Sequence, residues 1–293
     1  MKLVIWNKKS GVNNDNDAIL DGVNKLKESD DVVICEVEDL LSGSYKEKVD
    51  TTKLTHIVAI GGDGTVNISA TKAVQHDCKL VVIPAGTFNH FAKHNDLSLD
   101  IPTAFEVFEN GQTELIDIGK VNDTYFCNFV SVGFYADVIH ERVRGQKHEL
   151  SKWPSFLKAL IKEVKVAKSM RTIFELNETE VVKKTPLVFV GNGKYEMGSF
   201  DILNNRQSLK EHCLQVLLLK DFGKVKMLAF MLAAMSFDAT KSKGIESISL
   251  SEFSVHIANS ESVAVSLDGE AVELSLPLKF KTCPSTLQLV KSC

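Results

Sequence analysis

Short apolar runs alternate with helix-like segments along about the first 110 residues of the chain. Residues 3–6 form the first apolar run, and a polar segment follows it. From Ile19 to Leu26 the apolar residues recur three and four positions apart, which predicts an amphipathic helix. Three further continuous apolar runs lie at 32–34, 57–60 and 80–83. Strands that are apolar on both faces and alternate with helices predict a doubly wound parallel sheet.

The pattern changes after about residue 113. Asn122 and Asp123 separate two strand-like runs, 115–121 and 125–130, which predicts a β-hairpin turn. Later strand-like runs are rarely separated by helix, and they lie at 181–190, 214–219, 245–257, 262–267 and 272–280. This second half is therefore predicted to be mostly antiparallel.

Two helix-like stretches, about 151–168 and 224–237, interrupt the β-rich half. We therefore predict an N-terminal α/β domain over residues 1–115. The remaining residues, 116–293, are predicted to form an antiparallel β domain with inserted helices. Its last strand is able to return to the first domain.

Composition excludes several classes of protein. The 293 residues suit two domains, and the net charge of −4 disfavours a nucleic-acid binder. The longest apolar stretch, residues 227–237, is too short to span a membrane. The N-terminus reads as a first strand, not as a signal peptide. Six cysteines without a Cys-x-x-Cys spacing predict reduced thiols, and hence a cytoplasmic protein with neither a zinc site nor disulfides.

The most informative segment is a glycine-rich loop that follows the apolar run 57–60. It reads Gly-Gly-Asp-Gly-Thr over residues 61–65, and a helix-compatible segment comes next. Glycine permits positive φ and lets a ligand approach the backbone, and successive N–H groups at a helix N-terminus bind anions, so phosphate is the expected ligand. Asp63 is better suited to Mg²⁺ or a ribose hydroxyl than to phosphate. The alternative is a plain strand-to-helix turn. The loop matches neither the Gly-x-Gly-x-x-Gly fingerprint nor a P-loop.

A second polar loop follows the next predicted strand. Residues 84–93 read Pro-Ala-Gly-Thr-Phe-Asn-His-Phe-Ala-Lys. Loops at the carboxyl ends of neighbouring parallel strands define a crevice, which is the usual ligand position in such sheets. Near the C-terminus, Asp268, Gly269 and Glu270 place two carboxylates in a tight turn, which on its own reads as a hairpin turn.

Taken together, these motifs resemble the diacylglycerol kinase catalytic family, in particular the bacterial soluble lipid kinases. That family carries an early Asn-Pro-x-Ser-Gly, then Gly-Gly-Asp-Gly-Thr-x-Asn, Pro-x-Gly-Thr-x-Asn-x-Phe-Ala and a late Asp-Gly-Glu. This chain carries the corresponding residues at 7–11, 61–67, 84–92 and 268–270. The resemblance implies an N-terminal domain related to NAD kinases and phosphofructokinases and a C-terminal β-sandwich, with ATP between them.

The resemblance also implies roles for individual residues. Glu270 matches the general base that takes the proton from a lipid hydroxyl, and Asp268 precedes it in the catalytic motif. Asp63 would organise Mg²⁺ and phosphate. Phosphoryl transfer needs mainly positioning and charge neutralisation, so these groups suffice. The nucleotide-binding residues implied are Asn7, Ser10, Gly61, Gly62, Gly64, Thr65, Asn67, Gly86, Thr87 and Asn89.

Several positions depart from the family pattern. His90 stands where Asp is more usual, and Lys8 with Lys9 replaces the first motif's proline, which adds positive charge near phosphate. Residues 33–40 hold no threonine of the kind that often contacts nucleotide. In the structural Mg²⁺ loop of the β domain, Lys210 is electrostatically wrong for a cation site, so only Glu211 is carried over as a metal ligand.

Residues 141–171 suggest contact with a membrane. They hold nine basic residues and three glutamates, a local charge of +6, which leaves the rest of the chain at −10. Apolar residues from Trp153 to Val164 recur at helical spacing, and a basic amphipathic helix suits an enzyme that reaches a lipid substrate in an anionic bilayer. An ordinary packed surface helix has the same pattern. We therefore expect a cytoplasmic enzyme with peripheral membrane contact, and a homodimer is compatible with this interpretation.

Three functional classes are consistent with the residues. An ATP-dependent lipid kinase is favoured. A soluble-metabolite kinase of the NAD-kinase type shares the motif at 61–65, but it is not expected to carry both 84–92 and 268–270. A non-catalytic nucleotide or lipid sensor is the third, and the intact Asp63 and Glu270 argue against it. The sequence does not specify which lipid is phosphorylated.

Overall fold

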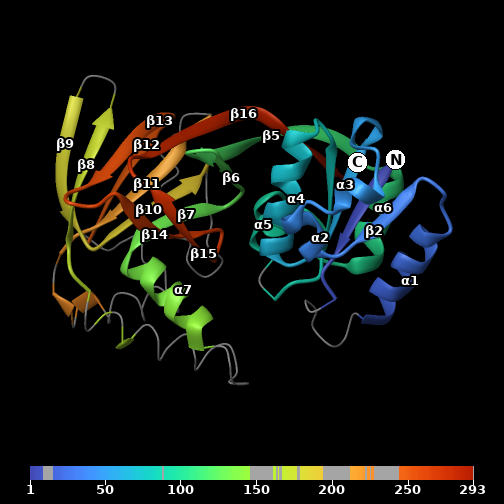
Figure 1. Cartoon of the computed structure of the whole chain (residues 1–293), viewed down its shortest axis with the longest axis horizontal. Helices are drawn as coiled ribbons and strands as arrows, with labels where there is room; N and C mark the ends of the chain where they lie inside the picture. The colour runs from blue at the N-terminus through green and yellow to red at the C-terminus, as the bar shows by residue number, and fades with distance from the viewer. Residues whose placement is uncertain are drawn as a thin grey trace. The chain divides into compact units, whose positions relative to one another are not determined.

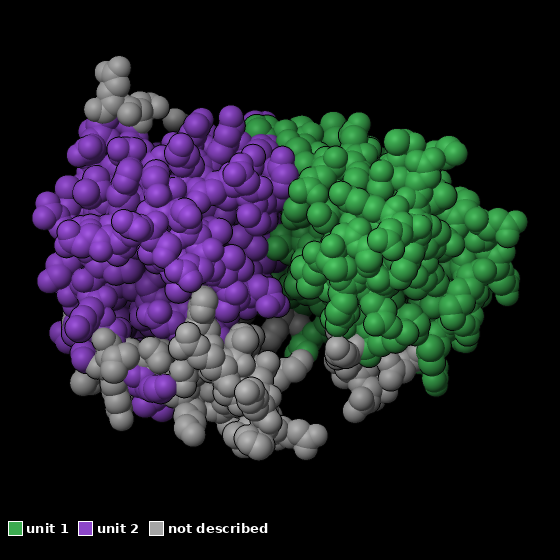
Figure 2. Space-filling view, in the orientation of Figure 1, with its two compact units in different colours: residues 1–118, 284–293 green, residues 119–283 purple. Residues whose placement is uncertain are grey.

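The computed structural model divides into two compact units (Figures 1 and 2). Unit 1 comprises Met1–Ile118 and Pro284–Cys293, and unit 2 comprises Gly119–Cys283. The residues described are 1–8, 16–87, 89–145, 161–162, 164, 167–176, 179–193, 212–221, 223–224, 226–227 and 244–292.

Unit 1 is an α/β unit built on a parallel sheet with the strand order β2-β1-β3-β4-β16. This arrangement confirms the predicted doubly wound sheet. Its elements are β1 (Lys2–Trp6), α1 (Asn16–Lys27), β2 (Val32–Cys35), α2 (Val37–Ser42), α3 (Tyr45–Lys48), a 3₁₀ turn (Thr51–Lys53), β3 (His56–Gly61), α4 (Asp63–Gln75), β4 (Lys79–Pro84), α5 (His90–His94), α6 (Ile101–Asn110), the start of β5 (Gln112–Val121) and the end of β16 (Leu278–Lys291).

Both faces of this parallel sheet are buried, as its continuous apolar runs predict. Val4, Val58 and Val81 pack in one cluster with residues of α1 and α6. Their neighbours on the opposite side of each strand, such as Leu3 and Ile57, are buried as well. Burial stabilises the fold by about 25 cal/mol for each Å² of apolar surface that is removed from water, so this core holds the strand ends, and the loops that follow them, in place.

Unit 2 is a sandwich of two antiparallel sheets around one apolar core. One sheet has the order β12-β11-β10-β7-β14-β15, and the other holds β16, β13, β8 and β9. Val130 and Val190 from the first sheet and Phe253 and Phe280 from the second all belong to the same buried cluster. The elements are the end of β5, β6 (Thr124–Phe126), β7 (Phe129–Gly133), α7 (Phe134–Gly145), β8 (Met170–Leu176), β9 (Thr179–Thr185), β10 (Leu187–Asn192), β11 (Leu214–Leu219), β12 (Ile245–Leu250), β13 (Glu252–Ile257), β14 (Ser262–Leu267), β15 (Glu270–Ser275) and the start of β16.

Some elements of unit 2 differ from the sequence prediction. The run 181–190 is divided at Pro186 into β9 and β10, because proline has no N–H to donate to a sheet ladder. The run 245–257 is divided at Ser251 into β12 and β13, which pair in different sheets. Helix α7 was not predicted. The hairpin turn at 122–123 is confirmed, since β5 and β6 pair on either side of it. Most of 151–168 and 224–237 lies outside the described residues.

The chain passes from unit 1 to unit 2 within β5 and returns within β16. These two strands also pair with each other. Within the described part of the chain, we find no helix with the length and apolar character that a membrane span requires.

Candidate active site

The two polar loops predicted to form a crevice lie side by side in unit 1. Gly61 ends β3 and is in register with Pro84, which ends β4. The Ala85 N–H donates to the Gly61 carbonyl oxygen at 2.9 Å and extends the ladder by one step into the loops. The carboxyl ends of the two parallel strands thereby bring residues 61–67 and 84–92 together.

The glycines allow close approach between these loops. A Cβ added to Gly86 would lie 2.4 Å from Cα of Gly62 and 2.7 Å from Oδ1 of Asn89. Of the two reasons expected for glycine here, positive φ is wrong, because Gly61, Gly62 and Gly86 all have φ outside the left-handed region and Gly64 lies within α4. What these positions require is the absence of a side chain.

Asn89 organises the second loop from within. Its backbone is left-handed, with φ of 51° and ψ of 46°, a conformation that asparagine tolerates better than most residues. Its Oδ1 accepts from the Gly86 N–H at 2.9 Å, and its Nδ2 donates to the carbonyl oxygens of Pro84 and Gly86, both at 3.1 Å. The structure therefore gives Asn89 a positioning role, and direct contact with a nucleotide stays a prediction.

Asp63 joins the two loops. It is the first residue of α4, where the helix dipole favours negative charge, and its Oδ1 accepts from the Phe91 N–H of α5 at 3.0 Å. Burial lowers the pKa of the neighbouring His90, while the charge of Asp63 acts in the opposite direction. The sequence does not predict the hydrogen bond from the Phe91 N–H, because every residue except proline has a backbone N–H.

Other residues predicted to bind nucleotide lie at the same edge of the sheet. The Asn7 N–H donates to the Ile60 carbonyl oxygen at 3.0 Å, and Asn7 Nδ2 lies 3.4 Å from Thr65 Oγ1. Thr65 and Asn67 are buried, whereas Thr87 is exposed. The Asn67 Oδ1 has no hydrogen-bond partner among the described residues, so a ligand hydroxyl or water can satisfy it there.

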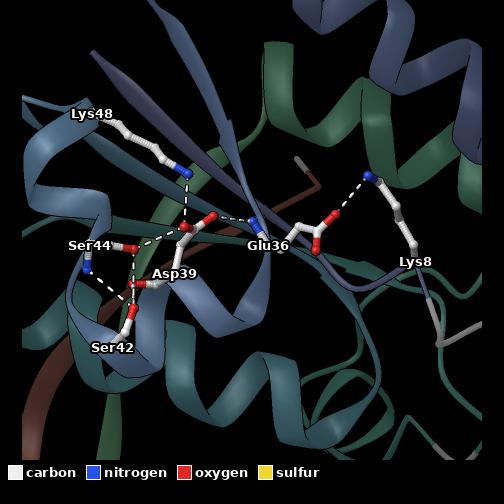
Figure 3. Close-up of polar contacts among 6 residues, drawn as sticks. All are labelled: Lys8, Glu36, Asp39, Ser42, Ser44 and Lys48. Atoms are coloured by element: carbon white, nitrogen blue, oxygen red, sulfur yellow. Dashed lines mark hydrogen bonds and ion pairs between the residues drawn. The ribbon is translucent and has the colours of Figure 1, made fainter.

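A cavity of about 390 Å³ lies at the carboxyl ends of β1 and β2. Trp6 and Ile34 contribute apolar surface, and its remaining lining residues are Lys8, Lys27, Cys35, Glu36, Asp39 and Lys48. Figure 3 shows two groups of contacts among four of its charged side chains, Lys8 with Glu36 and Asp39 with Lys48. In the first of them Lys8 Nζ lies 2.7 Å from Glu36 Oε1, so Lys8, which was expected with Lys9 to add positive charge near phosphate, is paired with a carboxylate, and Lys9 lies outside the described residues.

Asp39 forms the second charged group and fixes the start of α2. The hydrogen bond from Lys48 Nζ at 2.8 Å, with those from the Glu36 N–H and the Ser44 hydroxyl, lowers the pKa of Asp39 to about 2. Since this pKa lies below its ordinary value, the contribution to stability is present above about pH 4 and is lost as the pH falls through 2. The sequence analysis named Lys8 but missed Glu36, Asp39 and Lys48, for which the spacing Glu36-x-x-Asp39 was the available capping signal.

In unit 2 the Asp-Gly-Glu motif is a two-residue hairpin turn between β14 and β15, as predicted. Asp268 and Gly269 have φ of 49° and 90°, the positive values that a type I′ turn requires. Asp268 is buried. Its Oδ1 accepts from the N–H groups of Asn128 (2.8 Å) and Phe129 (2.7 Å), and its Oδ2 accepts from that of Cys127 (2.7 Å). Glu270, the first residue of β15, is exposed.

These contacts give Asp268 an architectural role, and its predicted catalytic role stays a prediction. We expect Asp268→Asn to lower the free energy of unfolding by about 3 kcal/mol, because an amide N–H₂ would face the Cys127 N–H in place of a charged acceptor. Urea unfolding measures this change. Asp123→Asn, at a fully exposed turn of the same unit, is the matched control. A loss no greater than that of the control would contradict the role.

Two predicted site residues, Ser10 and Glu211, lie outside the described residues, as does Lys210. Within the described ranges no three His, Cys, Asp or Glu side chains gather as a metal cluster. The predicted metal role of Glu211 stays a prediction.

Comparison with known proteins adds to this geometry. Residues 2–121 match the family model of the diacylglycerol kinase catalytic domain. A protein of Staphylococcus carnosus (strain TM300) named "Putative lipid kinase" is 30% identical over 142 residues, 48% of this chain and 46% of that protein. A protein of the same name from Staphylococcus epidermidis (strain ATCC 12228 / FDA PCI 1200) is 27% identical over 274 residues, 91% of this chain and 84% of that protein.

A solved structure shows the same fold. It is described as a "putative diacylglycerol kinase" from Bacillus anthracis str. Sterne, with a TM-score of 0.74 and 20% identity. The match covers 99% of this chain and 97% of that one. The α/β unit with a parallel sheet and the separate antiparallel unit are therefore a known architecture.

Proposed function

Since residues 2–121 belong to the diacylglycerol kinase catalytic domain family, we propose that this chain transfers the γ-phosphate of ATP to the hydroxyl group of a lipid. The observation that carries the proposal is the joining of the loops 61–67 and 84–92 through Asp63. This contact places a carboxylate and a helix N-terminus at the carboxyl edge of a parallel sheet, where ligands of such folds bind.

The phosphates of ATP are proposed to lie against the backbone of these two loops. The loops meet at Gly62 and Gly86 with no side chain between them, and the N-terminus of the 13-residue helix α4 favours an anion there. Mg²⁺ is usually bound by one or two carboxylates together with substrate phosphates, and Asp63 fits that donor set. When bound, the ion would neutralise charge on the phosphates.

The nucleoside half of ATP is proposed to enter the cavity at the ends of β1 and β2. Trp6 lines this cavity, and the next residue, Asn7, contacts Thr65 of the phosphate loop. Trp6 and Ile34 offer apolar surface to a base, and the Glu36 carboxylate is able to accept a hydrogen bond from a ribose hydroxyl. Trp6 and Asn7 thus connect the cavity directly to the proposed phosphate-binding loop.

Glu270 is proposed as the general base. It takes the proton from the lipid hydroxyl, whose oxygen forms a bond to the γ-phosphorus, and the bond from that phosphorus to the bridging oxygen of ADP breaks. The buried Asp268 turn holds Glu270 at the start of β15, and the exposed carboxylate is accessible to solvent. No other residue is needed to balance the proton.

The lipid substrate is proposed to resemble diacylglycerol, with an apolar body and one hydroxyl, and to be reached at a membrane surface through residues 141–171. The local charge of +6 supports attraction to anionic lipids. Most of this segment lies outside the described residues, so the proposal rests on its sequence.

Transfer of ³²P from γ-labelled ATP tests the proposal. We expect the purified chain with Mg²⁺ to label diacylglycerol in mixed phospholipid vesicles, and to leave soluble NAD unlabelled under the same conditions. A screen of extracted lipids then identifies the preferred hydroxyl. Labelling of NAD alone would favour the soluble-metabolite kinase, and tight ATP binding with no labelled product would favour a sensor.

A further inference from the structure

A second cavity, of about 380 Å³, lies wholly within unit 2 and plays no part in the proposed chemistry. It is formed by the segment before β8, the end of β9 and the segment after β11. Three of its lining residues are the lysines Lys168, Lys184 and Lys224, and the others are Ala167, Ser169, Pro186, Asp221, Gly223 and Met227.

The charged part of this cavity is positive. Among the lining residues that the structure describes, three lysines and one aspartate give a formal charge of +2, and all four residues are exposed. The Ser169 hydroxyl donates to Asp221 Oδ2 at 2.6 Å, and this hydrogen bond lowers the pKa of Asp221, with a smaller contribution from Lys184. Asp221 is therefore kept ionised by its hydrogen bond with Ser169. Because the three lysines outweigh this one negative charge, the cavity favours an anion.

The deeper part of the cavity is apolar. Pro186 and Met227 are buried, and Met227 belongs to the cluster that holds Phe134, Val138 and Leu219. Exposed cations above a buried apolar floor match an amphipathic ligand, whose phosphate meets the lysines while carbon-bonded hydrogens meet the floor. A free inorganic anion would make no use of the floor.

We propose that this cavity binds the phosphate headgroup of an anionic phospholipid in a bilayer, and so holds unit 2 on the membrane that contains the substrate. This inference rests on the proposed lipid kinase function, which requires the enzyme to work at a lipid surface. The described carboxylate of Glu246 does not oppose it, because Glu246 pairs with Lys183 at 2.7 Å and lies 4.0 Å from Lys220, and both lysines are outside the described cavity lining.

Vesicle co-sedimentation without ATP tests the proposal. We expect the wild type to bind phosphatidylcholine vesicles that contain phosphatidylglycerol, and Lys184→Glu with Lys224→Glu to weaken this binding at least about tenfold. The matched control is Lys279→Glu with Lys281→Glu, two exposed lysines of β16 in the same unit whose reversal changes the net charge equally. Because charges beyond a Debye length of about 8 Å are screened, the control should lose less than about threefold.

A variant that binds vesicles more tightly than the wild type provides a second test, because misfolding is not expected to increase this binding. Asp221→Asn keeps an acceptor for Ser169 and raises the formal charge of the cavity from +2 to +3, so it should bind the same vesicles several-fold more tightly. Lys184→Gln with Lys224→Gln serves if the glutamate variant fails to fold. Equal losses in the cavity and control variants, no loss in either, or no gain with Asp221→Asn would overturn the proposal.

Three further outcomes separate this inference from others. A poly-glutamate peptide that displaces the wild type from vesicles and loses its affinity in the cavity variant would indicate an acidic protein partner, and would overturn the lipid assignment. If the cavity variant alone loses vesicle binding but the wild type phosphorylates no lipid, the proposed function fails and the headgroup site stands. If the wild type phosphorylates lipid and the cavity variant binds vesicles normally, only this inference fails.

Discussion

Asp63→Asn is expected to lower kcat at least about 10²-fold while the chain keeps its fold. The asparagine Oδ1 can still accept from the Phe91 N–H, so the contact that joins the two loops remains, but the negative charge at the start of α4 is removed. A preorganised electrostatic group at a transition state contributes an effect of this size. The measurement is the rate of lipid phosphorylation at saturating ATP and Mg²⁺. Asp63→Ala removes both charge and acceptor and should abolish activity.

Asp100→Asn is the matched control for this experiment. Asp100 is the N-cap of α6 in the same unit, where it accepts from the Thr103 N–H at 3.0 Å, and it has no part in the proposed site. Its variant should lose stability without losing turnover per folded molecule. Turnover of Asp63→Asn within tenfold of the wild type would show that the carboxylate serves only to join the loops, and the electrostatic role would then be withdrawn.

The fold of unit 1 was predictable from the sequence because its strands are buried on both faces. A short, continuous apolar run such as 57–60 is typical of a strand that is buried on both faces, and the glycines that follow mark where the strand ends. Unit 2 was harder to divide. A continuous apolar run does not show where a chain leaves one sheet for another, as at Ser251, and Pro186 interrupts a run whose flanking residues are all strand-like.

The sequence predicted that the two polar loops of unit 1 lie side by side, but it predicted the roles of their individual residues only in part. Motif spacing placed Asp63 and Gly86 in neighbouring loops, and the hydrogen-bond network shows how they are held there. Asn89 and Asp268 bind backbone groups, which carry no sequence signal, so the interpretation of polar residues as ligand contacts missed their positioning roles. Of the two reasons given for the glycines, positive φ does not apply and close approach to the backbone does, because both properties select glycine and the sequence alone does not separate them.

The same distinction separates Asp268 from Glu270, although the two carboxylates are two residues apart. One is buried and accepts three backbone N–H groups, and the other is exposed at the start of β15. A carboxylate that is already saturated by donors is poorly placed to take a proton. The exposed carboxylate is therefore the one from which we expect a direct catalytic effect.

Glu270→Gln should lower kcat by about 10²–10⁴-fold, the range for loss of a general base, with little change in the KM for ATP. Glutamine keeps the size of the side chain and removes its capacity to take the proton from the lipid hydroxyl. Steady-state kinetics with labelled ATP measures both parameters, and isothermal calorimetry gives the affinity for ATP separately from turnover.

Glu273→Gln on the same strand distinguishes catalysis from a change in the hairpin. Glu273 Oε1 accepts from the Ser262 hydroxyl at 2.6 Å across the β14–β15 pair, so its variant perturbs the same ladder without touching the proposed base. Its kcat should stay near that of the wild type. If Glu270→Gln instead loses ATP affinity while its kcat is spared, the carboxylate binds the nucleotide and the proton must leave by another group. If both variants lose kcat equally, the effect comes from the geometry of the hairpin. Loss of a general base would lower kcat in Glu270→Gln alone, although the two glutamates lie only three residues apart on one strand.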